Sequence, residues 1–149
     1  MNLKQQLYRA CQAYLESRAR QINDSIAALQ EAANDETKSS AGDKYETGRA
    51  MAHLEIEKYA TQLSEVNRMM ADLSRLSPND VTDVVRPGSL VFTSRGNFYI
   101  AIHAGEHTVE SQKFFIVSTG SPIAQKMIGL KAGDEFSLPG GSFSIVTIQ

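Results

Sequence analysis

The stretch LSRLSPND at residues 73–80 divides the 149-residue chain into two halves of different composition. Proline disfavours helix in the residue before it, so a helix that reaches Leu76 is expected to end at Ser77. Twelve of the sixteen Ala lie before this break, whereas all six Phe, all four Pro and eight of the ten Gly lie after residue 76. Val, Ile and Thr number seven before the break and nineteen after it. This bias predicts helix in the first half and sheet in the second.

Before the break, apolar and small residues form two series whose spacings alternate between three and four. The first series runs from Tyr8 to Ala33 and the second from Ala52 to Leu73. Such spacing is typical of helices with one buried seam, and a polar run at residues 34–43 joins the two. The sequence therefore predicts an antiparallel coiled-coil hairpin over residues 1–76, with an acidic tip loop near 34–43. Pairing of the helices with a second chain in a longer bundle stays open as an alternative.

After the break, short apolar runs separated by turn residues predict about five strands. One short helix is expected at residues 121–129, because Ser121 suits the N-cap, Pro122 the first turn and Gly129 the C-terminal end. The second half is therefore predicted to be a small antiparallel sheet domain over residues 80–149, which makes the whole chain α+β. The expected strands cover residues 89–93, 98–102, 113–117, 135–138 and 143–148.

Charge and cysteine content exclude several classes of protein. Fifteen Lys and Arg against seventeen Asp and Glu give a formal net charge of -2, which excludes a protein that coats nucleic acid by charge alone. The single cysteine, Cys11, has no partner for an internal disulfide. The sequence contains no run of about eighteen apolar residues that could span a membrane, and residues 1–10 lack the apolar core of a signal peptide. We therefore expect a cytoplasmic protein without a membrane partner.

The sequence offers little evidence for a catalytic or metal site of its own. His103 and His107 are four residues apart, but Gly105 lies between them in a predicted strand end and loop. Two such histidines do not share a helical face, so no stably bound metal is expected there. No pair of nucleophile and base is evident either, which predicts a protein that is not an enzyme.

The acidic residues of the predicted tip loop are the main candidates for a shared metal site. Asp35, Glu36 and Asp43 lie in or beside this loop. Mg²⁺ is usually held by one or two carboxylates together with phosphates and water, so these side chains could complete a magnesium site supplied by another molecule. The competing interpretation is that Asp43 and Glu46 form a capping box at the start of the second helix.

Three motifs stand out in the second half of the chain. They are a short predicted helix that begins Ser-Pro-Ile at residues 121–123, a glycine-rich turn at 129–135, and Pro-Gly-Gly at 139–141 before the last strand. Together these motifs resemble the C-terminal domain of the GreA/GreB family of bacterial transcription elongation factors. The family pattern has Gly-Lys-x-x-Gly-Asp at this turn. Here Leu130 separates Gly129 from Lys131, whereas Gly133 and Asp134 keep the register of that pattern. The family architecture, an N-terminal antiparallel coiled coil followed by an FKBP-like domain, extends the resemblance over nearly the whole chain.

The resemblance implies a factor that binds RNA polymerase. In this family the globular domain docks beside the secondary channel of the polymerase, and the coiled coil enters that channel. Acidic tip residues then help to hold a catalytic Mg²⁺ and a water, so that the polymerase hydrolyses backtracked RNA. By position, Ser121, Pro122 and Ile123 fall on the docking surface. Contact with nascent RNA and DNA would be indirect, and a rod that enters a narrow channel would be monomeric.

The predicted tip departs from the family pattern, in which an Asp and a Glu stand three apart shortly before an Asn-Ala-Glu-Tyr stretch. Alignment on Tyr45 places Lys38 and Ala41 at these two positions, and neither side chain can hold a metal ion. A secondary-channel regulator without cleavage activity is therefore an open alternative, as is a coiled-coil protein-interaction adaptor. A peptidyl-prolyl isomerase on the FKBP-like fold is disfavoured, because the chain has no Trp for the floor of the pocket.

Overall fold

The computed structural model describes the backbone of residues 1–37 and 42–149, and the side chains outside residues 36–46. Contacts between residues divide the chain into two compact units. The hairpin unit comprises Leu15–Met70, and the sheet unit comprises Met1–Tyr14 together with Ala71–Gln149. The domain ranges expected from the sequence, 1–76 and 80–149, stay a prediction.

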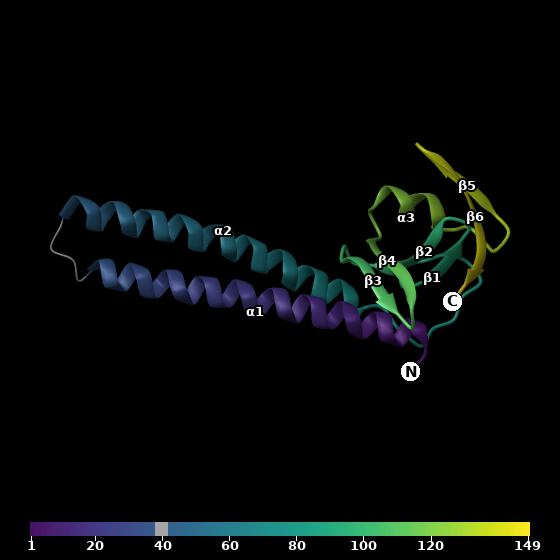
Figure 1. Cartoon of the computed structure of the whole chain (residues 1–149), viewed down its shortest axis with the longest axis horizontal. Helices are drawn as coiled ribbons and strands as arrows, with labels where there is room; N and C mark the ends of the chain where they lie inside the picture. Colours follow the sequence, from purple (N-terminus) through teal and green to yellow (C-terminus); the bar gives the residue numbers. More distant parts are fainter. Residues whose placement is uncertain (38–41) are drawn as a thin grey trace. The chain divides into compact units, whose positions relative to one another are not determined.

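Two long helices account for the hairpin unit. They are α1 (Leu3–Thr37) and α2 (Gly42–Ser74), which lie side by side in Figure 1. Leu15, Ile22 and Val66 are buried within this unit, as the alternation of three and four residues predicts. Ala33 and Ala52, the small residues of the two series, are buried as well. The predicted pair of packed N-terminal helices is confirmed.

The start of α1 and the end of α2 belong to the sheet unit, and local hydrogen bonds define both helix ends. Asn2 Oδ1 accepts the backbone N–H of Gln5 at 2.8 Å, and Gln5 Oε1 accepts the backbone N–H of Asn2 at 3.1 Å. This reciprocal pair is a capping box, which satisfies two amide groups that the first turn of α1 cannot pair within the helix. At the other end, Leu76 N–H donates to the carbonyl of Leu73 at 3.0 Å, so α2 closes with a tight turn just before the predicted break.

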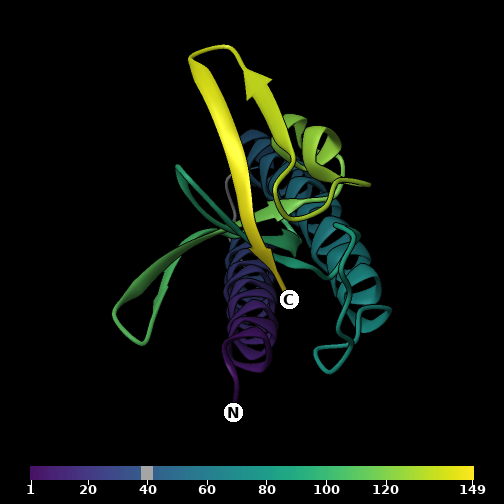
Figure 2. The same cartoon turned by 90° about the vertical axis from the view of Figure 1, so that its right-hand side faces the viewer.

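The sheet unit contains one six-stranded sheet and one short helix, α3 (Pro122–Met127). The order of strands across the sheet is β3-β4-β2-β1-β6-β5. Figure 2 shows the β5–β6 hairpin, the last part of the chain, extending from this sheet. The predicted α+β class, with helices first and a sheet with one short helix after them, is confirmed. The strands are β1 (Leu90–Thr93), β2 (Gly96–Ala101), β3 (Gly105–Val109), β4 (Gln112–Ser118), β5 (Glu135–Leu138) and β6 (Gly141–Ile148).

One strand and one pairing differ from the sequence-based expectation. Residues 105–109, expected as a strand end and loop, form β3, which pairs antiparallel with β4. This strand carries Glu, His and Thr at its centre and lies at the sheet edge, so it shows no alternation of buried apolar residues. Because β3 and β4 form a hairpin at this edge, β4 runs parallel to β2 and the sheet is not purely antiparallel.

The two faces of the sheet pack against different partners because side chains alternate along each strand. On one face, Val91, Phe98 and Ile100 form a core cluster with Met127 of α3. Tyr99 points to the opposite face, where Cys11 and Tyr8 of α1 are close enough to influence its ionisation. The first turns of α1 are therefore part of the sheet unit's packing, which explains why they group with it.

Candidate functional site

Of the three predicted tip carboxylates, only Asp35 has a described side chain. It is exposed near the end of α1. The side chains of Glu36 and Asp43 lie outside the described residues. Among the side chains that the structure describes, no group of three or more His, Cys, Asp or Glu could hold a metal ion. The shared magnesium site stays a prediction.

The predicted docking residues Ser121, Pro122 and Ile123 begin α3. Ser121 is the N-cap: its hydroxyl accepts the backbone N–H of Ala124 at 3.3 Å and donates to the carbonyl of Ser118 at 2.8 Å. Pro122 stands in the first turn, where its missing N–H has no helical partner to lose. The local sequence therefore sets the start of α3, as predicted.

The three residues present different amounts of surface. Pro122 is exposed, whereas Ser121 is half-buried and its hydroxyl serves the cap. Ile123 is half-buried and packs against the core cluster. The structure therefore gives Ile123 a core role, and leaves Pro122 as the member of the three that is most open to contact.

Two further exposed side chains share the α3 surface with Pro122. Gln125 and Lys126 follow Pro122 by three and four residues, which places them on the same side of a helix. The Gln125 side chain donates to the carbonyl of Thr119 at 2.6 Å, and Lys126 lies in the last turn of α3. Neither residue is among the docking residues predicted from the sequence, although helical spacing from Pro122 identifies both. We call Pro122, Gln125 and Lys126 the α3 surface.

The glycine-rich turn that follows α3 is explained by backbone geometry. Gly129 and Gly133 have φ angles of 93° and 91°, in the left-handed region that favours glycine. Asp134 Oδ2 accepts the backbone N–H of Lys131 at 2.8 Å, which closes the turn. Val85 N–H donates to the carbonyl of Leu130 at 2.8 Å and ties the turn to the loop after α2. The described contacts of this turn are therefore structural: they set the path of the chain within the sheet unit.

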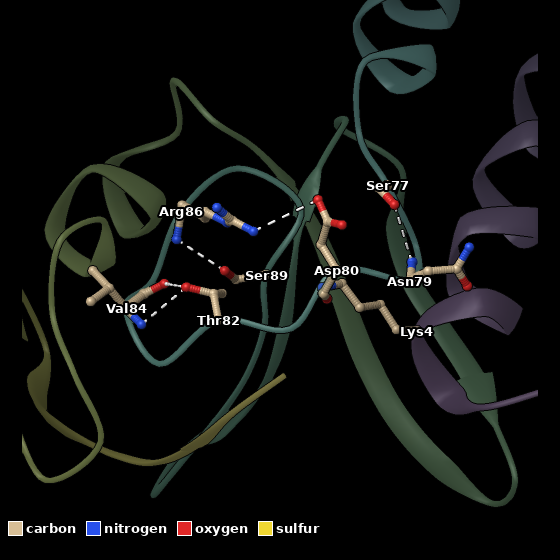
Figure 3. A network of polar contacts seen from close by, with 8 residues as sticks. All are labelled: Lys4, Ser77, Asn79, Asp80, Thr82, Val84, Arg86 and Ser89. Atoms are coloured by element: carbon tan, nitrogen blue, oxygen red, sulfur yellow. Dashed lines mark hydrogen bonds and ion pairs between the residues drawn. The ribbon is translucent and has the colours of Figure 1, made fainter.

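A polar network that the sequence analysis missed joins α1 to the loop after α2 (Figure 3). Lys4 is only 5% exposed, and its Nζ donates to the backbone carbonyl of Asp80 at 2.6 Å. The carboxylate of Asp80 lies 3.7 Å from the guanidinium of Arg86. Burial lowers the pKa of Lys4, the nearby Asp80 raises it, and Arg86 lowers it further. No periodicity or motif marks a buried lysine, because its partner is a main-chain oxygen 76 residues away.

Three further chemically reactive side chains of the described residues are Cys11, His103 and His107. Cys11 is fully buried, and burial raises the pKa of its thiol to about 12, which keeps it protonated and poorly nucleophilic. The ring of His107 on β3 packs edge-on against Tyr14 with ring centres 6.4 Å apart. His103 lies exposed just after β2. That the chain has no nucleophile and base of its own stays a prediction.

The chain was compared with protein-family models and with characterised proteins. No family model matches it, and no characterised protein matches it. Within residues 1–37 and 42–149, no helix combines the length and the apolar character needed to cross a membrane.

Proposed function

We propose that this chain is an RNA polymerase-binding factor of the Gre type, which acts at the secondary channel. The support is the combination of two features: a packed helical hairpin followed by a small sheet domain, and the Ser-Pro-Ile, Gly-Asp and Pro-Gly-Gly motifs within that domain. The observation that carries the proposal is that Ser121 and Pro122 start a short helix and leave Pro122 exposed beside Gln125 and Lys126.

In this proposal the α3 surface contacts the polymerase and the hairpin reaches into the channel. The exposed proline supplies a rigid apolar contact, and Lys126 favours an acidic patch on the partner. The protein is a cytoplasmic monomer, and nucleic acid is contacted only through the elongation complex. A net charge of -2 for the chain accords with binding to a protein rather than to phosphates.

Binding is tested by immobilising the full chain and adding bacterial core RNA polymerase at micromolar concentrations. Pro122→Glu places a carboxylate on the proposed contact and suits the first turn of a helix, where negative charge is favourable. Pro139→Glu is the matched control, because Pro139 is a second exposed proline, in the turn between β5 and β6. The proposal requires wild type and Pro139→Glu to bind equally and Pro122→Glu to bind at least about tenfold more weakly.

Transcript cleavage is a separate question, because Lys38 and Ala41 occupy the positions of the two acids in the family pattern. The assay is RNA cleavage in a stalled, backtracked elongation complex, with wild type and a variant in which Asp35, Glu36 and Asp43 are all Ala. Cleavage by wild type that the triple variant lacks supports a magnesium ion shared between the tip and the polymerase. Polymerase binding without cleavage by either protein supports the second candidate, a secondary-channel regulator without cleavage activity.

A further inference from the structure

A shallow hollow of about 580 Å³ lies in the sheet unit, and no residue of the α3 surface lines it. Its walls come from the loop after α2, the glycine-rich turn and the last residues of β6. Hydrogen bonds hold the first wall in place: the Thr82 hydroxyl donates to the carbonyl of Val84 at 2.8 Å and accepts its N–H at 3.2 Å (Figure 3). These two bonds fix the local conformation of that wall. Its lining residues are Val81, Thr82, Asp83, Ala132, Thr147 and Ile148.

One wall of the hollow is an open strand edge. β5 pairs with β6 only as far as Ser144, and the next residue, Ile145, exchanges backbone hydrogen bonds with Gly133 and Asp134. Beyond Ile145, no strand of the described chain lies on that side of β6. The last two residues of β6, Thr147 and Ile148, therefore have a neighbour, β1, on one side only.

The open edge presents main-chain groups at Ile148. Gln149 donates its N–H to the carbonyl of Leu90 at 2.8 Å and accepts the N–H of Leu90 at 2.9 Å, so both of its main-chain groups face β1. Main-chain groups of successive residues in a strand point to opposite edges. The N–H and C=O of Ile148 therefore point away from β1, on the side of the hollow. An unpaired edge of this kind is a template for an added strand.

Beside two threonines, the lining of the hollow offers apolar side chains and one carboxylate. Val81 is 85% exposed, so a large apolar side chain stands in solvent at the rim. Asp83 is exposed, and its carboxylate has no hydrogen bond or ion pair with any described residue. The neighbouring Asp80, by contrast, is paired with Arg86. An apolar rim with one unpaired carboxylate fits a segment that alternates apolar and basic residues.

From these features we infer that the hollow binds an extended, basic peptide segment of a partner protein, which adds to the sheet beside β6. The main chain of the segment pairs with Ile148, an apolar side chain packs against Val81, and a Lys or Arg pairs with Asp83. A nucleic acid strand is disfavoured, because Asp83 repels phosphates. A second copy of the chain is disfavoured too, because pairing of two β6 edges would bring two Asp83 carboxylates together. This inference does not depend on polymerase binding.

The test is selection of short linear peptides, displayed on phage, on the full-length chain. Counter-selection uses Asp83→Lys, and the matched control is Asp24→Lys, because Asp24 is an exposed carboxylate on α1. The expected pool is rich in Lys and Arg and lacks proline at its centre. Its peptides bind wild type and Asp24→Lys equally and bind Asp83→Lys about tenfold more weakly.

The selected peptide is then used to test whether binding occurs at the open edge of β6. On binding, the backbone amide signal of Ile148 should shift in the NMR spectrum, and a peptide with methylated main-chain nitrogens should lose at least about tenfold in affinity. The inference is overturned if the selection enriches no peptide. It is equally overturned if the enriched peptides bind Asp83→Lys as tightly as wild type, or leave the amide of Ile148 unchanged.

Discussion

Replacement of Tyr99 by Phe is expected to stabilise the sheet unit, against the usual direction of a core substitution. Tyr99 is fully buried in β2, and its hydroxyl is the buried side-chain polar atom that has no hydrogen-bond partner among the described residues. Its surroundings raise the pKa of this phenol, chiefly by burial and to a smaller extent through Cys11 and Tyr8. The Tyr99→Phe substitution removes the hydroxyl that has no hydrogen-bond partner among the described residues and keeps the aromatic ring.

The size of the effect follows from two opposing contributions. A buried hydroxyl without a partner costs roughly 1–3 kcal/mol in proteins. Loss of one oxygen leaves a small void, which costs about 0.3 kcal/mol at the usual penalty for cavity volume. We therefore expect the free energy of unfolding to rise by about 1 kcal/mol, which corresponds to about 2–4 °C in melting temperature for a chain of this size.

The assay is thermal and urea unfolding followed by near-ultraviolet circular dichroism, which reports on packed tyrosines. Tyr59→Phe is the matched control, because Tyr59 lies partly exposed on α2 and its substitution should change stability by no more than about 0.5 kcal/mol. A loss of more than about 0.5 kcal/mol in the free energy of unfolding of Tyr99→Phe would show instead that the hydroxyl has a stabilising partner.

Three further predictions concern single residues of the sheet unit. Ser111, with φ of 62° in the β3–β4 turn, is held in the left-handed region, so Ser111→Gly should raise the free energy of unfolding in urea by about 0.5–1 kcal/mol; an unchanged or lower value contradicts the argument. The pKa of Lys4 lies below its usual 10.5, so the native state binds fewer protons than the unfolded state, and wild type should gain stability relative to Lys4→Met as the pH rises from about 8 to about 10. If the free energy of unfolding in urea changes with pH equally in both proteins, this prediction is wrong. Cys11 should react with a thiol reagent only when the chain unfolds, and rapid labelling in native buffer would contradict its burial.

The coarse fold is predictable from the sequence because its signals are periodic. The alternating spacing from Tyr8 to Ala33 identifies α1, and Ser121 with Pro122 identifies the start of α3. The strand β3 is not predictable in the same way: its central residues are polar, and its hydrogen bonds to β4, not apolar burial, hold it in the sheet. The parallel pairing of β2 with β4 depends on that missed strand, so it could not be inferred either.

The candidate site was predictable only in part. The motif around Pro122 locates the α3 surface, and helical spacing adds Gln125 and Lys126. The buried Lys4 and the open edge at Ile148 depend on contacts between residues far apart in the chain, which no local pattern encodes. The role proposed for Asp83 could not be predicted for the same reason: its carboxylate lines a hollow together with the end of β6, which is distant in the sequence.

Polymerase binding through the α3 surface, as proposed, is best measured as the affinity of the full chain for bacterial core RNA polymerase. We expect saturable binding at micromolar or lower concentration, weakened at least about tenfold by Pro122→Glu and unaffected by Pro139→Glu. Absence of binding by wild type at micromolar concentration, or equal binding by Pro122→Glu, would contradict it.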